Sequence, residues 1–116
     1  MPPDILGTLE VINEAAGYLE ADTTGLNFDT FMADRRTRQI VEHNVIILGA
    51  AVNRLRRHVP DIAARIGASN QFVELGDEVL HDYDRIDYSI VWFAVQESLP
   101  VLQAEVETLL RKAEAS

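Results

Sequence analysis

His81 and Tyr83 stand two residues apart, and Asp77 lies four residues ahead of the histidine. An imidazole titrates near neutral pH, so His81 could take or return a proton during a reaction. Asp77 would share a helical face with His81, where its carboxylate could orient the ring. Side chains two residues apart point to different sides of a helix, so His81 and Tyr83 can face one cleft only at a helix end or turn. The spacing therefore predicts a site at a helix terminus.

The segment from Leu75 to Tyr83, followed by Ile86-Asp87 and Val91-Trp92, resembles the signature of the HepT-like family of HEPN proteins. That signature is an arginine, four intervening residues, a histidine, any residue and a tyrosine. The resemblance extends over nearly the whole chain. It implies an all-helical homodimer, without a cofactor, that cleaves RNA without metal and is paired with an MntA-like nucleotidyltransferase antitoxin in a toxin–antitoxin system.

The resemblance also implies a modification site. In such proteins the tyrosine of the signature accepts AMP from the partner nucleotidyltransferase, and that role would fall on Tyr83 here. A bulky charged adduct beside His81 would block a cleft by its volume and its charge. Tyr88 is a weaker alternative acceptor, expected instead to pack against the last helix.

The chain departs from the signature at the arginine, because Gly76 occupies that position. The arginine is expected to hold the phosphate during cleavage, so its absence predicts weak or absent ribonuclease activity. Arg85 could supply the charge if its turn folds back toward His81, and Gly76→Arg would restore the signature at one position. The chain also reads Gly49-Ala50-Ala51 where the family often has Gly-Glu-Ala.

Three functions remain open on these residues: a ribonuclease toxin, a catalytically silent member that binds its partner, and a plain helical interaction module. His81 and Tyr83 alone would be ordinary surface residues near a helix end, and the resemblance is what makes a functional site worth testing. Activity lost on His81→Ala would indicate the ribonuclease. Binding to a nucleotidyltransferase without cleavage would indicate the silent member, and neither property would indicate the plain module.

Composition fits one domain over residues 1–116, with 47% hydrophobic and 25% charged residues. The chain has no cysteine, which excludes disulfides and thiolate metal sites and suits a reducing cytoplasm. The longest apolar run, Val45 to Val52, is far shorter than the roughly 20 residues that span a bilayer. The three histidines are scattered without ligand spacing, so no metal site is expected.

The net charge of −9 argues against a general attraction to nucleic acid, so RNA would need a local basic patch. Six arginines cluster in two groups, and the simplest interpretation is a solvated helix face whose arginines pair with some of the acids. These arginines are Arg35, Arg36, Arg38, Arg54, Arg56 and Arg57.

Apolar residues recur at helical spacing almost throughout, which predicts an all-α, up-and-down bundle of four to five helices. Pro3 can open the first helix, and a central helix is expected from Arg35 to His58. Apolar residues on the central and final helices exceed what one small bundle covers, so a homodimer is expected. Shorter helices are expected after Asn27 or Asp29, over 61–66 and from a cap at Ser69 or Asn70, and Asp87 can cap a final helix that Pro100 kinks or restarts.

Overall fold

The computed structural model describes residues 3–115 and confirms the all-helical class; no strand occurs in that range. The long helices are α1 (Pro3–Thr23), α3 (Arg35–His58), α5 (Ser69–His81) and α7 (Leu99–Ala115). Short helices α2 (Phe28–Ala33), α4 (Pro60–Ala63) and α6 (Tyr88–Phe93) connect them. A single 3₁₀ turn covers Tyr83–Arg85, and a π-helical segment, Ala94–Ser98, joins α6 to α7.

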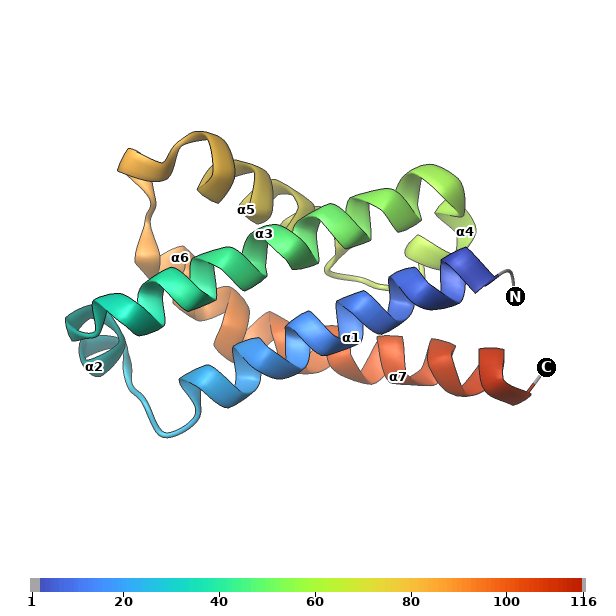
Figure 1. The fold of residues 1–116 in the computed structure, drawn as a ribbon, viewed down its shortest axis with the longest axis horizontal. Coiled ribbons are helices and arrows are strands. Elements are labelled where there is room, and N and C mark those ends of the chain that lie inside the picture. Colours follow the sequence, from blue (N-terminus) through green and yellow to red (C-terminus); the bar gives the residue numbers. More distant parts are fainter. Residues whose placement is uncertain (1–2, 116) are drawn as a thin grey trace.

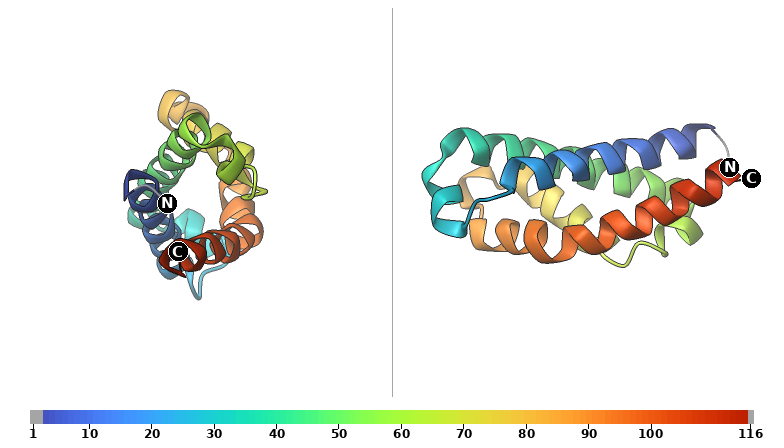
Figure 2. Two further views of the ribbon diagram at one scale, coloured as in Figure 1. Left: turned by 90° about the vertical axis from the view of Figure 1, so that its right-hand side faces the viewer. Right: turned by 90° about the horizontal axis from the view of Figure 1, so that it is seen from below.

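Helices α1, α3 and α7 run side by side along the long axis of the molecule, and α5 lies along α3 (Figure 1). The end-on view shows these helices arranged around one core (Figure 2). The start of α1 and the end of α7 lie at one end of the bundle, whereas the end of α5 and the start of α6 lie toward the other (Figure 1). The core side chains are fully buried and mostly aliphatic, among them Leu9, Ile12, Leu19, Val45, Leu48, Val52, Phe72 and Leu102.

Helix α3 has the predicted bounds because both of its ends are chemically marked. The Asp34 carboxylate accepts the backbone N–H of Thr37 at 3.1 Å and thereby caps the first turn. The Thr37 hydroxyl also donates to the carboxylate, and the two hydrogen bonds from Thr37 hold the pKa of Asp34 below its usual value. At the other end Arg56, Arg57 and His58 lie in the last turn, where the helix dipole favours cations, and Pro60 follows.

The segment between α3 and α5 differs from the prediction. Helix α4 begins at Pro60 and ends at Ala63, three residues short of the expected end at Ile66. Neither Ser69 nor Asn70 caps α5, because Ala68 holds the N-cap position without a side-chain hydrogen bond. The Ser69 hydroxyl instead donates backwards to the carbonyl oxygens of Ala63 and Ile66, at 2.9 and 2.7 Å, and so closes the connecting loop.

The hydrogen-bond pattern of the final helix changes from α to π before Pro100, and the α-helix restarts at Leu99. The sequence predicts a kink or a restart at this proline. Asp87 caps α6, accepting the N–H of Ser89 at 3.0 Å. The Leu99 N–H then reaches the carbonyl of Ala94, five residues back, in the π-helical segment. Proline has no N–H to offer the carbonyl four residues before it, and the wider π turn accommodates this loss without ending the helix.

Candidate functional site

His81 closes α5, and both of its contacts are with Asp77. The Nδ1 atom lies 2.9 Å from the Asp77 carbonyl oxygen and 3.1 Å from its carboxylate Oδ1. Both oxygens can only accept a hydrogen bond, so Nδ1 carries the hydrogen. In the neutral ring the lone pair is then on Nε2, which has no partner among residues 3–115. The side chain of His81 is 66% exposed, so Nε2 is open to a ligand from solvent.

Tyr83 and Arg85 lie in the 3₁₀ turn that follows, and no residue of this turn is buried. The Arg85 N–H donates to the Asp82 carbonyl at 2.8 Å, which fixes the backbone of the turn. Tyr83 is 59% exposed. Within the described range, no hydrogen bond or ion pair joins Tyr83 or Arg85 to His81. The histidine and the tyrosine are therefore sequence neighbours on one exposed corner.

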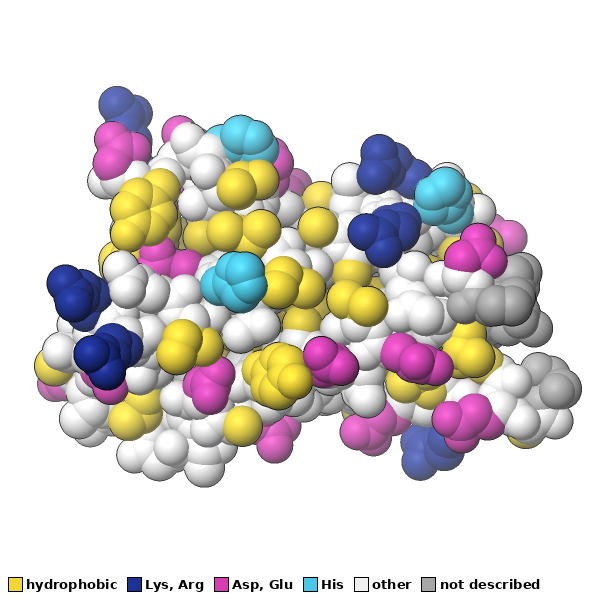
Figure 3. Space-filling view, in the orientation of Figure 1, with side chains coloured by type: hydrophobic (Ala, Val, Ile, Leu, Met, Phe, Trp, Pro, Cys, Tyr) yellow, Lys and Arg dark blue, Asp and Glu magenta, His cyan; other side chains and the backbone are white. Residues whose placement is uncertain are grey.

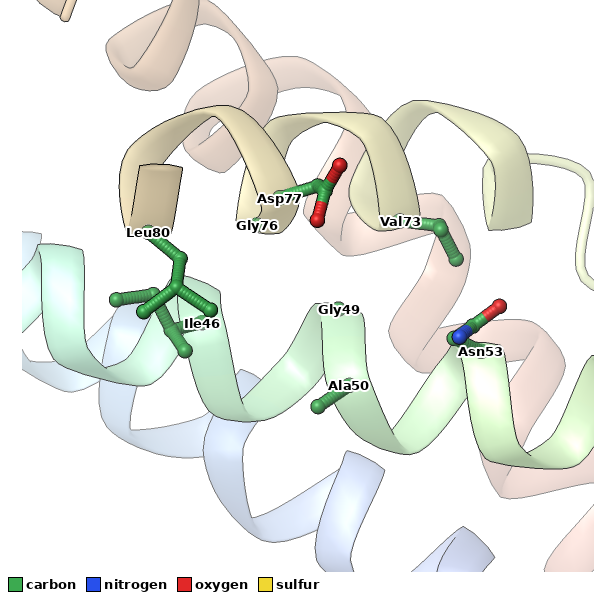
Figure 4. Close-up of a pocket in the computed structure, with 8 residues that line it drawn as sticks. All are labelled: Ile46, Gly49, Ala50, Asn53, Val73, Gly76, Asp77 and Leu80. Carbon is green, nitrogen blue, oxygen red and sulfur yellow. The ribbon is translucent and has the colours of Figure 1, made fainter. Parts of the chain in front are cut away.

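Gly76, at the position of the signature arginine, lies where α5 crosses α3. A groove of about 150 Å³ runs beside this crossing, with the backbones of Gly49 and Gly76 at its base (Figure 4). Ile46 and Leu80 form one side of the groove, and Val73 and Asn53 lie on the other (Figure 4). A Cβ atom on Gly76 would lie 3.0 Å from the Val45 carbonyl oxygen, which is tighter than ordinary packing allows. Asp77 lines the groove, but His81 does not.

Glu42 is a buried carboxylate that sequence reasoning did not single out. Glu42 is only 5% exposed, and its Oε2 atom accepts a hydrogen bond from the Tyr88 hydroxyl at 3.3 Å. The other oxygen, Oε1, is buried without a partner among the described residues. Burial raises the pKa of Glu42, against the lowering effects of the Tyr88 hydrogen bond and the Arg38 charge. The sequence feature that could have indicated a buried carboxylate is the position of this acid between Val41 and Val45, on the apolar face of the central helix.

Tyr88 begins α6, and its ring and hydroxyl contact residues of α2 and α3. Its ring meets Phe31 edge-on at 6.3 Å, and the Arg38 guanidinium carbon lies 5.6 Å from the ring centroid. Arg38 also donates to the Met32 carbonyl at the end of α2. Burial raises the pKa of Tyr88, and the charges of Glu42 and Tyr83 add to that rise. Tyr88 follows the exposed turn Tyr83–Arg85 by three residues, so this cluster adjoins the turn along the chain.

The arginines do not pair with acids as the sequence interpretation supposed. Among residues 3–115, the only ion pair within 4 Å joins His81 and Asp77. Arg56 instead donates to Asn70 and Asn53, at 2.8 and 3.0 Å. Basic side chains gather over the two ends of α3, with hydrophobic side chains between them (Figure 3). At both ends of α3, therefore, no arginine forms an ion pair within 4 Å of a described carboxylate, although Arg38 lies close enough to Glu42 to lower its pKa.

Two further observations concern metal ions and membranes. No group of three or more His, Cys, Asp or Glu side chains in the described part of the chain could hold a metal ion. No helix of that part is both long enough and apolar enough to cross a membrane.

Comparison with known proteins agrees with the sequence signature. The model of a family described as "Ribonuclease HepT-like" matches residues 9–109, which include Asp77, His81 and Tyr83. A protein of Thermococcus cleftensis named "Probable ribonuclease HepT" is 30% identical over 105 residues, covering 87% of this chain and 91% of that protein. "Putative RNase TTE0752" of Caldanaerobacter subterraneus is 23% identical over 104 residues, with 90% and 92% covered. "Putative RNase MJ1380" of Methanocaldococcus jannaschii is 27% identical over 108 residues, with 90% and 94% covered.

Proposed function

Because the chain belongs to the HepT-like ribonuclease family, we propose that it is the RNase-type component of a toxin–antitoxin pair, with weak or lost cleavage activity. The observation that carries this proposal is the orientation of His81. Asp77 holds Nδ1 as a donor, so the neutral ring offers its Nε2 lone pair to solvent. A histidine in this form can accept the proton of an RNA 2′-hydroxyl.

The proposed loss of activity follows from the absence of a positive charge placed beside His81 to stabilise the phosphate. Cleavage builds negative charge on the phosphate, and a preorganised cation or donor is needed to stabilise it. Gly76 brings no charge, and no hydrogen bond or ion pair joins Arg85 to His81 or Asp77 among the described residues. Loss of one such donor commonly lowers a rate on the order of a hundredfold or more. Cleavage should therefore be slow, and detectable only with excess protein.

The proposed regulator is an MntA-like nucleotidyltransferase that places AMP on Tyr83. The tyrosine is exposed and lies in a turn without buried residues, so an active site could reach its hydroxyl. The transfer would join the tyrosine oxygen to the α-phosphorus of ATP, release pyrophosphate and lose the phenolic proton. AMP on Tyr83 would then place charge and bulk two residues from His81.

A homodimer is part of the proposal. Ile40 on α3 and Leu80 on α5 are about half exposed, as are Ile90 and Phe93 on α6. Ile40 lies on the central helix, and Ile90 and Phe93 lie at the start of the predicted final helix; these are the two helices whose surplus of apolar residues predicts a partner. Light scattering at micromolar concentration should give twice the mass of the chain, and a clean monomer would contradict this part.

The second candidate is a silent binding protein, and Gly76 is the observation that favours it. The decisive experiment expresses the chain with and without an MntA-like nucleotidyltransferase and follows cleavage of a labelled RNA. Slow cleavage that His81→Ala abolishes supports the ribonuclease. Co-purification without any cleavage supports the silent partner. If the chain neither cleaves RNA nor co-purifies with the nucleotidyltransferase, it is a plain helical module, and the proposed pairing is refuted.

A further inference from the structure

None of the side chains in the turn Tyr83–Arg85 is buried, so the turn is held in place by the helices that precede and follow it, α5 and α6. On the α5 side, the Asp82 N–H donates to the Glu78 carbonyl at 2.8 Å and continues the helix. On the α6 side, Ile86 is partly buried against the core, and Tyr88 is the first residue of the helix. The position of Tyr83 therefore depends on how firmly the start of α6 is fixed.

Tyr88 is fixed by groups that are distant in sequence. Its hydroxyl donates to Glu42, which lies 46 residues earlier on α3. Arg38 covers the ring and joins it to the end of α2 through the Met32 carbonyl. Phe31 and Trp92 pack tightly beside it, with ring centroids 5.1 Å apart. Three helices thus meet at one phenol, a few residues from the exposed turn.

Glu42 is a costly residue to keep in this place. A carboxylate that loses water must regain hydrogen bonds to both oxygens, and Oε1 has regained none among the described residues. An apolar residue would suit the buried position beside Val41 better if packing were the only requirement. Among the described residues, the side-chain hydrogen bond that Glu42 makes is the one to Tyr88, so we seek its role there.

We propose that Glu42 is a positioning residue for the turn that carries Tyr83, acting through its hydrogen bond to the Tyr88 hydroxyl. The inference deepens the proposed function, on which it rests only for treating Tyr83 as the group that reacts. Glu42 itself touches neither Tyr83 nor His81 through a hydrogen bond or ion pair. In this role it holds the start of α6, which Asp87 caps, against α3, and so sets where the tyrosine hydroxyl stands relative to His81.

Amide hydrogen exchange in the full chain tests this role without any partner or RNA. In Glu42→Ala and in Tyr88→Phe, the amides of Arg85 and Ser89 should exchange at least about tenfold faster than in the wild type. Glu42→Gln keeps an oxygen that can accept from Tyr88 and should preserve most of the protection. Exposed Tyr18 supplies the matched control, because Tyr18→Phe removes a hydroxyl that makes no such bond.

Two comparisons separate positioning from general stability. Exchange at the core of α1, around Leu9 and Ile12, should change much less than exchange at the turn. Combining Glu42→Ala with Tyr88→Phe should add little to either change alone, since both remove one bond. Unchanged turn amides overturn the proposal. So does an equal rise at α1 and at the turn, which would make Glu42 a stabilising residue only.

The proposed function can fail separately. If the wild type neither cleaves RNA nor accepts AMP but the exchange pattern holds, Glu42 still positions the turn and only the assigned chemistry is wrong. If Tyr83 does accept AMP, Glu42→Ala should slow the transfer about as much as Tyr88→Phe does. An unslowed transfer in both variants would count against the proposal.

Discussion

Gly49 and Gly76 meet backbone to backbone where α3 crosses α5, and a Cβ atom on Gly76 would lie 3.2 Å from the Cα of Gly49. A Cβ on Gly49 would lie only 2.6 Å from the Phe72 carbonyl oxygen. The two helices approach this closely because neither residue has a side chain. Gly76 is thus a packing residue as well as the site of a missing arginine.

Gly76→Arg completes the signature in the sequence but should therefore fail to restore RNA cleavage. The side chain must push α5 away from α3, and overpacking of this kind costs about 1–3 kcal/mol of unfolding free energy. Urea denaturation measures the loss, and RNA cleavage should not rise. Gly17→Arg is the control, because no atom lies within 4 Å of a Cβ atom at Gly17. Faster cleavage by a stable Gly76→Arg protein would show that the groove accepts the arginine.

His81→Ala should leave the fold intact and abolish any RNA cleavage. The imidazole is largely exposed and its one ion pair lies on the surface, so the unfolding free energy should change by less than about 0.5 kcal/mol. Thermal unfolding and a labelled-RNA assay measure the two effects. His58→Ala removes an exposed histidine from the last turn of α3 and should keep the wild-type rate. Equal activity in both variants would remove His81 from the mechanism.

Tyr83→Phe should prevent the transfer of AMP to this chain. The phenolic oxygen is the atom that would bond to phosphorus, and phenylalanine keeps the ring without it. Intact-mass spectrometry after incubation with ATP and the partner nucleotidyltransferase would show whether one AMP group has been added. Tyr18→Phe, another exposed tyrosine, should be modified as the wild type is. AMP still present on Tyr83→Phe would point to Tyr88 or Tyr18.

Glu42→Gln should stabilise the fold more at alkaline than at acid pH. Burial raises the pKa of Glu42 in the folded chain, so between the unfolded and folded pKa values the folded state binds more protons. The contribution of Glu42 to stability is thus greatest below its pKa in the unfolded chain. That contribution is lost as pH rises through its pKa in the folded chain. Glutamine does not titrate.

As pH rises from acid to mildly alkaline, the unfolding free energy of Glu42→Gln should therefore increase relative to that of the wild type. The expected increase is up to about 1 kcal/mol. Urea denaturation at several pH values measures it. Glu10→Gln, on the exposed surface of α1, should give a nearly flat difference. A trend of opposite sign would mean that the Tyr88 bond and the Arg38 charge outweigh burial.

Local patterns in the sequence predicted what local interactions determine. The bounds of α3 follow from Asp34, apolar periodicity and Pro60, and the contact between Asp77 and His81 follows from their spacing. The contacts that were missed join distant parts of the chain. Nothing near Glu42 indicates that a tyrosine 46 residues later will bind it. The approach of Gly49 to Gly76 likewise depends on the crossing of two helices, which periodicity does not specify.

The common position of the two chain ends has a practical consequence for such experiments. The start of α1 and the end of α7 lie together, toward the opposite end of the long axis from the exposed corner of His81 and Tyr83 (Figure 1). A fluorophore or affinity tag attached at either end would thus leave that corner accessible to RNA or to a second protein. Two copies could also be joined in tandem, with the linker confined to the far end of the bundle.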